Sequence, residues 1–293
     1  RRWSWLCLAW AVLVGVFFPT TVWSQDEVEE NLIERLEGTI PYDEITVKAE
    51  DDTVEVIQLE LLDIPGRRTP ELKTNGKLEI RLLGNPDDVY EVFWRDITKI
   101  RLYEDIMIDE VNGYIDSLKF DEAFDYLLFL RSEYSNLPGT QELLARYQYS
   151  QGADWLKKGR NLEALSLLES LYEDFPEFVF DGGPDNAKTK LNEAAQAVLK
   201  DYLNAQKIVL ARRFSQRLIK THGVSAVPSA LDTLRTLRDI ATGKRDEARR
   251  LLDEGKLREA QKAVREMIEI FPQVSGGREI AVEAIRKYPL VTV

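Results

Sequence analysis

The sequence predicts an α+β protein in which a small antiparallel β domain precedes an all-α array of repeated helical hairpins. Between about residues 26 and 103, apolar and polar residues alternate, as they do in half-buried strands. From about residue 104 to 287, apolar residues recur every three or four positions, which is typical of amphipathic helices. The helical part also repeats its own pattern. Such units stack on one another because a single hairpin is too small to bury its apolar face.

Residues 1–24 have the composition of a secretory signal peptide. Arg1 and Arg2 precede the apolar run LCLAWAVLVGVFF, and the segment closes with the sequence Val22, Trp23, Ser24. A basic start, a short apolar run and a small residue near the exit are typical of such leaders. We therefore expect export to a periplasmic or other extracytoplasmic location, with cleavage after Ser24. A leader retained as a membrane anchor is the alternative.

Residues 25–103 are predicted to form the β-rich domain, whose short strands could roll into an SH3-like barrel. A short helix is expected at 27–37. Turn-forming pairs such as Pro65–Gly66 and Asn75–Gly76 separate the strands, and a further turn is expected at Asn85–Pro86–Asp87. We interpret Asp51–Asp52 and Arg67–Arg68 as solvated loop residues. The predicted strands are 53–61, 77–83, 89–94 and 97–103, with 43–48 as a candidate fifth strand.

Residues 104–287 are predicted to form helical hairpins. Periodicity leaves open whether 184–221 is one long helix or breaks near Asn204, but the repeat spacing favours the break. The expected pairs are 104–117 with 121–135, 140–158 with 161–175, 184–205 with 207–221, and 228–254 with 257–271, followed by a final helix at 277–287. Residues 288–293 are apolar and β-branched, which predicts the first strand of a further domain.

The repeat is defined by a small set of recurring positions. In the two clearest copies a glycine precedes an alanine by five residues, and a proline follows that alanine by twelve. Glycine ends a helix by adopting the left-handed conformation, and proline cannot continue one. The positions are Gly152, Trp155, Gly159, Ala164 and Pro176 in one copy, Gly255, Ala260 and Pro272 in another, and Ala123 and Ala211 in two weaker copies.

The residue inventory argues against catalysis and against cofactors. His222 is the only histidine and Cys7 the only cysteine, and Cys7 lies in the leader, so no metal cluster or triad can be built on these residue types. The formal net charge of −12 disfavours nucleic acid as a partner, because its phosphates would be repelled. We therefore expect a non-enzyme without a cofactor or metal.

Three segments have both a structural and a functional interpretation. His222 is expected near a helix C-terminus, where a cation is favourable. A position near the same helix C-terminus also explains the basic stripe of Arg213, Arg217 and Lys220 beside Arg212. The alternative is that this stripe docks an acidic partner or a lipid surface. The segment 180–186 carries Asp181, Asp185 and Asn186 near glycines. It lacks the ligands of a calcium loop, and a helix start at Pro184 explains it.

The repeats resemble the tetratricopeptide repeat (TPR). The resemblance rests on the alanine–proline spacing, on the preceding glycines, and on Gly152 and Trp155 at the small and aromatic positions of a first helix. The chain departs from the family because its alanines lie 41, 47 and 49 residues apart (123, 164, 211 and 260), whereas the family period is about 34. Ala123 and Ala211 also lack the closing proline. The resemblance implies a TPR-like scaffold that binds a protein or peptide partner on its repeats.

The whole chain also looks like the N-terminal region of bacterial ABC-transporter solute-binding proteins of the peptide type. The resemblance rests on the leader, on the motifs PGRRTPE and YEVFWRDITKI, on the degenerate repeats and on the closing AIRKYPLVTV. It implies a role in transport, with a membrane reached only through the leader or a transporter partner. A free-standing periplasmic scaffold and an accessory region of a secreted hydrolase are the alternatives. The oligomeric state is left open.

Overall fold

The computed structural model describes residues 40–48, 53–134, 137–180 and 186–287. From Ile40 onward these residues belong to one compact unit of the chain. The predicted signal peptide, the helix at 27–37, the pair Asp51–Asp52 and the apolar tail at 288–293 lie outside the described residues.

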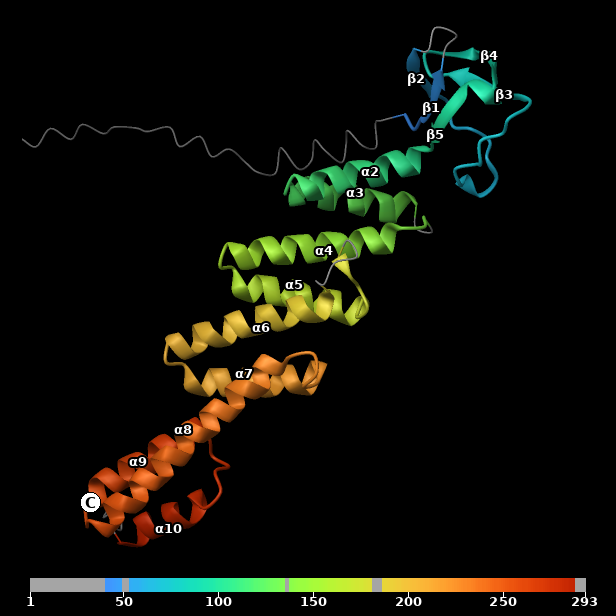
Figure 1. Cartoon of the computed structure of the whole chain (residues 1–293). Coiled ribbons are helices and arrows are strands. Elements are labelled where there is room, and N and C mark those ends of the chain that lie inside the picture. Colours follow the sequence, from blue (N-terminus) through green and yellow to red (C-terminus); the bar gives the residue numbers. More distant parts are fainter. Residues whose placement is uncertain (1–39, 49–52, 135–136, 181–185, 288–293) are drawn as a thin grey trace, which may run out of the picture. The chain divides into compact units, whose positions relative to one another are not determined.

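The first described part is an antiparallel sheet of five strands, in which the candidate strand at 43–48 joins the four predicted ones (Figure 1). Its strands follow the order β4-β3-β2-β1-β5, so β1 lies between β2 and β5 and pairs with both. Alternation buries one side, where Ile45, Leu59 and Ile80 contribute to the core. No ladder joins β4 to β5 among the described residues, which leaves both as edge strands. The strands are β1 (Asp43–Lys48), β2 (Val54–Leu59), β3 (Lys77–Leu82), β4 (Asn85–Phe93) and β5 (Ile97–Arg101).

The turn predicted at Asn85–Pro86–Asp87 is wrong. Asn85 already pairs with Leu82, so Leu83 and Gly84 form the turn between β3 and β4. The register then shifts, and Arg81 pairs with Val89. Residues 86–88 are therefore a bulge within β4. Proline is tolerated there because a bulge on an edge strand does not need its missing N–H.

The helical part consists of the predicted hairpins, and each described helix boundary lies within a few residues of its predicted position. The break near Asn204 is confirmed, since α6 ends at Asn204 and α7 begins at Ile208. The start of α6 is wrong by three residues. Asn186 caps the helix by accepting the N–H of Thr189 at 2.9 Å. The helices are α2 (Tyr103–Asp116), α3 (Phe120–Glu133), α4 (Thr140–Lys157), α5 (Asn161–Asp174), α6 (Ala187–Asn204), α7 (Ile208–His222), α8 (Pro228–Asp253), α9 (Leu257–Ile270) and α10 (Gly277–Lys287).

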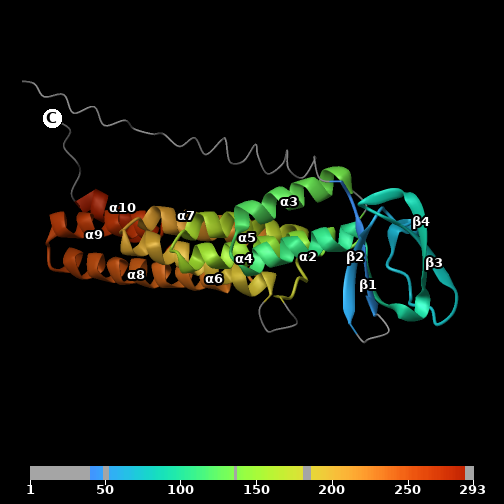
Figure 2. The same cartoon turned by 90° about the horizontal axis from the view of Figure 1, so that it is seen from above.

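The hairpins pack as a layered array. The first helices α2, α4, α6 and α8 contact one another in succession, and the second helix of each hairpin contacts the first helix of the next. Figure 2 shows the first helices along one side and the second helices along the other. Fully buried leucines such as Leu168, Leu171 and Leu191 fill the space between neighbouring hairpins. Each hairpin thus buries its apolar face against its neighbours, as the repeat predicted.

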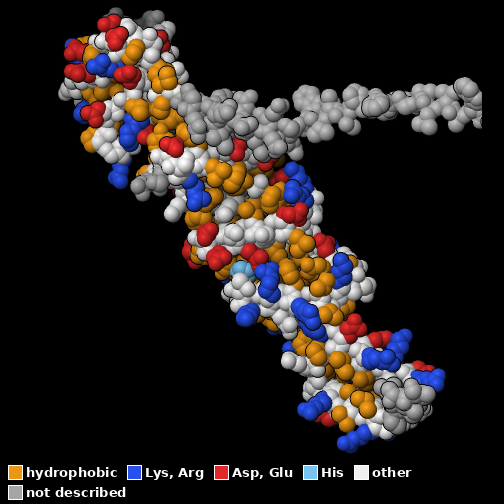
Figure 3. Space-filling view, turned by 180° about the vertical axis from the view of Figure 1, so that it is seen from behind, with side chains coloured by type: hydrophobic (Ala, Val, Ile, Leu, Met, Phe, Trp, Pro, Cys, Tyr) orange, Lys and Arg blue, Asp and Glu red, His pale blue; other side chains and the backbone are white. Residues whose placement is uncertain are grey.

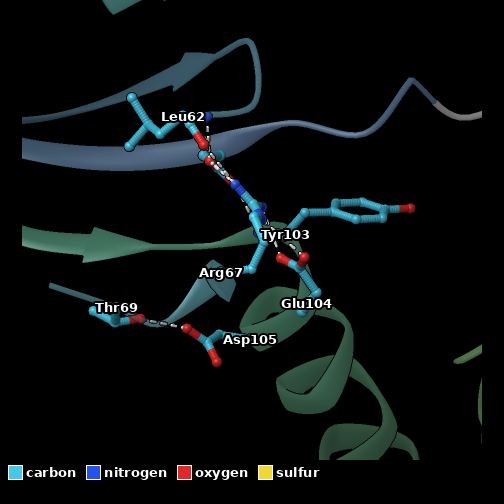
Figure 4. A network of polar contacts seen from close by, with 7 residues as sticks. Leu62, Arg67, Thr69, Tyr103, Glu104 and Asp105 are labelled. Carbon is cyan, nitrogen blue, oxygen red and sulfur yellow. Dashed lines mark hydrogen bonds and ion pairs between the residues drawn. The ribbon is translucent and has the colours of Figure 1, made fainter. Parts of the chain in front are cut away.

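A buried ionic network joins the sheet to the first hairpin (Figure 4). Arg67, in the loop between β2 and β3, donates to Asp43 of β1 at 2.8 and 2.7 Å and to Glu104 of α2 at 2.9 and 2.7 Å. Asp43 is fully buried and also accepts the backbone N–H groups of Leu62 and Tyr103. Hydrogen bonds to Asp43 and then Glu104 raise the pKa of the Arg67 guanidinium. The prediction of a solvated loop is therefore wrong for Arg67.

Candidate protein-interaction groove

The four repeat alanines occupy equivalent places in the array. Each lies in the second helix of its hairpin, and the side chain of each is fully buried. A larger side chain would displace the facing first helix, which explains the small residue at this position. The alanines are Ala123 in α3, Ala164 in α5, Ala211 in α7 and Ala260 in α9.

The turn inside each hairpin also repeats, including where the sequence shows no glycine. The residue five before each alanine has a positive φ: +74° at Gly159 and +72° at Gly255, but also +59° at Leu118 and +55° at Gln206. After Gly159, the N–H of Arg160 donates to the carbonyl of Trp155 at 2.9 Å, which is the hydrogen bond of a Schellman C-cap. The corresponding bonds, at 2.8 to 2.9 Å, join Lys119 to Tyr114, Lys207 to Tyr202 and Lys256 to Leu251.

The remaining predicted positions also lie in or beside the hairpins. A Cβ atom added at Gly152 in α4 would lie 2.8 Å from Cγ of Leu168, so the two helices of this hairpin approach closely there. Trp155 stacks under the guanidinium of Arg160 at 4.7 Å. Pro176 follows the end of α5 by two residues, and Pro272 follows the end of α9 by two. These positions therefore shape the hairpins and the way they pack.

A groove of about 410 Å³, lined by both polar and apolar side chains, lies between α6 and α8, the first helices of two successive hairpins. Its α6 wall carries residues at steps of three and four, which form one helical stripe. The N–H of Ser229 donates to Oδ1 of Asn192 at 3.0 Å and holds the start of α8 against α6. The groove residues are Asn192, Gln196, Leu199, Lys200, Leu203 and Asn204 of α6 with Pro228, Ser229, Asp232, Thr233 and Thr236 of α8.

The groove offers both hydrogen-bond donors and acceptors. In the described part of the chain, the side chains of Gln196, Lys200 and Asn204 make no hydrogen bond or ion pair. A side-chain amide can donate and accept at once, and an ammonium donates only. Thr233 and Thr236 donate to carbonyls of their own helix, which leaves their oxygens able to accept. This combination suits a ligand that itself alternates N–H and carbonyl groups.

His222 and two residues of the basic stripe region, Arg212 and Arg217, make contacts within the array. His222 ends α7, as predicted, and its Nε2 lies 2.8 Å from Oε1 of Glu169 in α5. Arg217 donates to the same oxygen at 2.7 Å. Arg212 donates to the carbonyls of Glu269 and Ile270 at the end of α9, and burial lowers the pKa of its guanidinium. Arg212 and Arg217 are thus used to join hairpins.

The described part of the chain contains neither a candidate metal cluster nor a candidate membrane-spanning helix. Among the described residues, no group of three or more His, Cys, Asp or Glu side chains could hold a metal ion. Most of the segment considered as a calcium loop, 181–185, lies outside the described part. None of the described helices is long and apolar enough to cross a membrane.

Comparisons with known proteins do not assign a family. No protein-family model matches the chain, and a search of curated proteins finds no match. Among solved structures, the chain is similar to the TPR2AB domain of yeast Sti1 in complex with pHSP90. That similarity has 18% identity and a TM-score of 0.24, and it covers 63% of this chain and 70% of the other. At this level of similarity, the term TPR-like rests on the hairpins and buried alanines of this chain.

Proposed function

We propose that this protein is a non-catalytic protein-interaction module whose α6–α8 groove holds an extended segment of a partner protein. The observation that carries the proposal is the groove itself. Its wall presents Gln196, Lys200 and Asn204 without partners among the described residues, beside the apolar Leu199 and Leu203. A polar group that loses water on binding must regain a hydrogen bond, and these side chains can supply several to a peptide backbone.

The charges support a polypeptide over a polyanion. The net charge is −12, and Figure 3 shows acidic and basic side chains interspersed along one face of the helical part. A nucleic acid needs a continuous basic surface to offset its phosphates. The groove carries one cation, Lys200, and one carboxylate, Asp232, so its own net charge is near zero. A ligand of mixed polarity fits that balance.

The setting in which this module works rests on the sequence alone. We propose export behind a cleaved leader, and a place at the front of an ABC-transporter solute-binding protein of the peptide type. A free-standing periplasmic scaffold and an accessory region of a secreted hydrolase are the alternatives. Reading the coding frame beyond Val293 separates them, because two lobes of alternating strands and helices would support the first. A stop codon there would favour the scaffold, and metal-dependent or hydrolytic turnover by the purified chain would contradict a non-enzyme.

The groove itself is tested by selecting ligands on it. Random 16-residue peptides are displayed on phage and selected on the full chain, and the strongest binders are titrated against Gln196→Ala/Asn204→Ala. Loss of two hydrogen-bonding amides is expected to weaken binding about tenfold or more. Gln216→Ala is the matched control, since Gln216 lies exposed on α7 outside the groove. Selected peptides that bind the double variant as well as the wild type would exclude the groove as the binding site.

A further inference from the structure

In the described part of the chain, no strand pairs with the outer edge of β4, which is separate from the groove between α6 and α8. This strand lies at one end of the strand order, and β3 is its one partner among the described strands. Beyond its bulge it exposes two large apolar side chains, Val89 (52% exposed) and Phe93 (44%). Edge strands of this kind pair readily with other chains, and natural proteins usually cover or charge them.

The register shows which backbone groups face outward. One step beyond the last ladder pair, Lys77 and Phe93, the N–H of Trp94 donates to the carbonyl of Gly76 at 3.1 Å, so the register continues there as a hydrogen-bonded pair. Hydrogen-bonded and non-hydrogen-bonded pairs alternate along an antiparallel ladder. The backbone groups of Val89, Glu91 and Phe93 therefore point away from β3. In the described residues no other segment donates to or accepts from them. Three alternate residues thus offer N–H and carbonyl groups to an incoming strand.

The side chains beside this edge carry more negative than positive charge. Glu91 lies midway between Val89 and Phe93, on the same face of the strand, and forms an exposed ion pair with Lys77. Arg81 donates to the carbonyl of Pro86 in the bulge. The exposed charges on β3 and β4 are four carboxylates and two cations: Glu79, Asp87, Asp88 and Glu91 against Lys77 and Arg81.

A second copy of the chain is disfavoured at this edge in the register centred on Glu91. Antiparallel pairing of two β4 strands around their shared centre would place Glu91 directly opposite its own copy. Like charges at directly opposite positions destabilise a strand pair. A strand with a cation at that position would instead gain a favourable pair on the same face.

We propose that the free edge of β4 pairs with an extended strand of a partner protein that carries Lys or Arg opposite Glu91. The same strand carries apolar side chains opposite Val89 and Phe93. Backbone hydrogen bonds to three outward residues supply the binding, and the alternating side chains supply the selectivity. The partner is thus recognised as an apolar–x–basic–x–apolar sequence in extended conformation.

The test uses two peptides that differ at one position. They are Gly-Thr-Val-Thr-Lys-Thr-Val-Thr-Gly and the version with Glu in place of Lys. Each carries an N-terminal fluorescent label and is titrated with the full chain by fluorescence anisotropy. The Lys peptide is expected to bind at least about two- to five-fold more tightly than the Glu peptide, which is the effect of one exposed charge pair. Amide exchange supplies a second readout. The amides of Val89, Glu91 and Phe93 become protected on binding, whereas those of Tyr90 and Val92 are already in the ladder. Equal affinity, or no new protection at the three outward amides, would overturn the proposal.

Two variants separate backbone pairing from charge. Glu91→Pro removes the central outward N–H without removing a bond to β3. It is expected to weaken both the Lys and the Glu peptide about tenfold, whereas loss of the carboxylate alone would weaken only the Lys peptide. Protection of the Tyr90 and Val92 amides shows whether this variant keeps the sheet. Glu91→Lys keeps the N–H and is expected to prefer the Glu peptide. A Glu91→Lys variant that still prefers the Lys peptide would contradict the pairing. The groove variant Gln196→Ala/Asn204→Ala is expected to bind both peptides as the wild type does.

Discussion

Tyr147 is a buried tyrosine whose ionisation is coupled to folding. Its ring lies on Phe120 and Phe124 of the preceding helix, with ring centroids 6.1 and 5.9 Å away. Burial raises the pKa of its phenol from 10.0 to about 12, although a hydrogen bond with Gln151 opposes the shift. Because the pKa is higher in the folded state than in the unfolded state, the neutral phenol of Tyr147 contributes its full share of the folding free energy below pH 10. This contribution is lost as the pH rises through about 12.

Tyr147→Phe is therefore expected to flatten the alkaline loss of stability. Between pH 8 and pH 11.5 the wild type should lose about 2 kcal/mol more than the variant, which has no proton to release there. Urea unfolding of both proteins at the two pH values measures this difference. Tyr90→Phe, at an exposed tyrosine of the sheet, is the control and should behave as the wild type does. Equal losses in Tyr147→Phe and the wild type would show that this phenol does not govern the alkaline limb.

At the scale of single residues, apolar spacing predicted burial better than it predicted conformation or pairing. The repeat alanines were predicted and are fully buried, because helix–helix distance restricts side-chain size at those positions. The left-handed turns at Leu118 and Gln206 were not predicted, because neither residue is glycine. Arg67 was interpreted as a solvated residue because its partner Asp43 lies 24 residues away in the sequence. Only the fold brings such a pair together.

At the scale of elements, the close approach of α4 and α5 depends on Gly152. A methyl group there would lie 2.8 Å from Cγ of the fully buried Leu168, so Gly152→Ala forces the helices apart. We expect a loss of about 1–3 kcal/mol in the free energy of unfolding. Gly113→Ala is the matched control, because a Cβ atom in α2 would meet no atom within 4 Å. The helix propensity of alanine should make that variant about 0.5–1 kcal/mol more stable.

Thermal unfolding of the two glycine variants gives opposite signs if the α4–α5 packing is correct. An equal gain in both would mean that Leu168 moves aside freely and that Gly152 has no role in packing. Helix positions such as these were predictable because a 3.6-residue period over fourteen or more residues is a strong signal. The bulge in β4 was not predictable. The Asn-Pro-Asp sequence favours a turn, and only the pairing of Asn85 with Leu82 places it inside a strand.

At the scale of the whole molecule, the groove could not be predicted from the sequence. Its two walls come from α6 and α8, and the bond that joins them spans the 37 residues from Asn192 to Ser229. In the sequence, the polar residues of each wall cannot be told from those of an ordinary solvent-exposed helix face, since amides and hydroxyls are also common on solvated surfaces. The groove arises only because the hairpins place two first helices side by side. Repeat proteins create binding surfaces from stacking in this way, without a motif in any single repeat.

The connection between the sheet and the helices depends on Arg67, which satisfies two carboxylates of different elements. Asp43 is fully buried and the side chain of Glu104 is 8% exposed, so removing the cation leaves negative charge without a counter-ion. Breaking such a buried pair costs several kcal/mol, and about a quarter of the Arg67 side chain (26%) remains exposed. Arg67→Ala is therefore expected to destabilise the protein by about 3 kcal/mol.

Arg68→Ala is the matched control, because its exposed side chain should change stability by about 0.5 kcal/mol or less. Arg67→Lys should recover only part of the loss, because an ammonium cannot form the paired hydrogen bonds of a guanidinium to both carboxylates. Amide exchange locates the effect. The N–H groups of Leu62 and Tyr103 donate to Asp43. In Arg67→Ala, their exchange rates should rise above the wild-type values by more than the exchange rates in the α8–α9 hairpin do. An equal increase in exchange rate at all amides would show that Arg67 stabilises the molecule as a whole. That result would contradict its assignment to the connection between the sheet and the array.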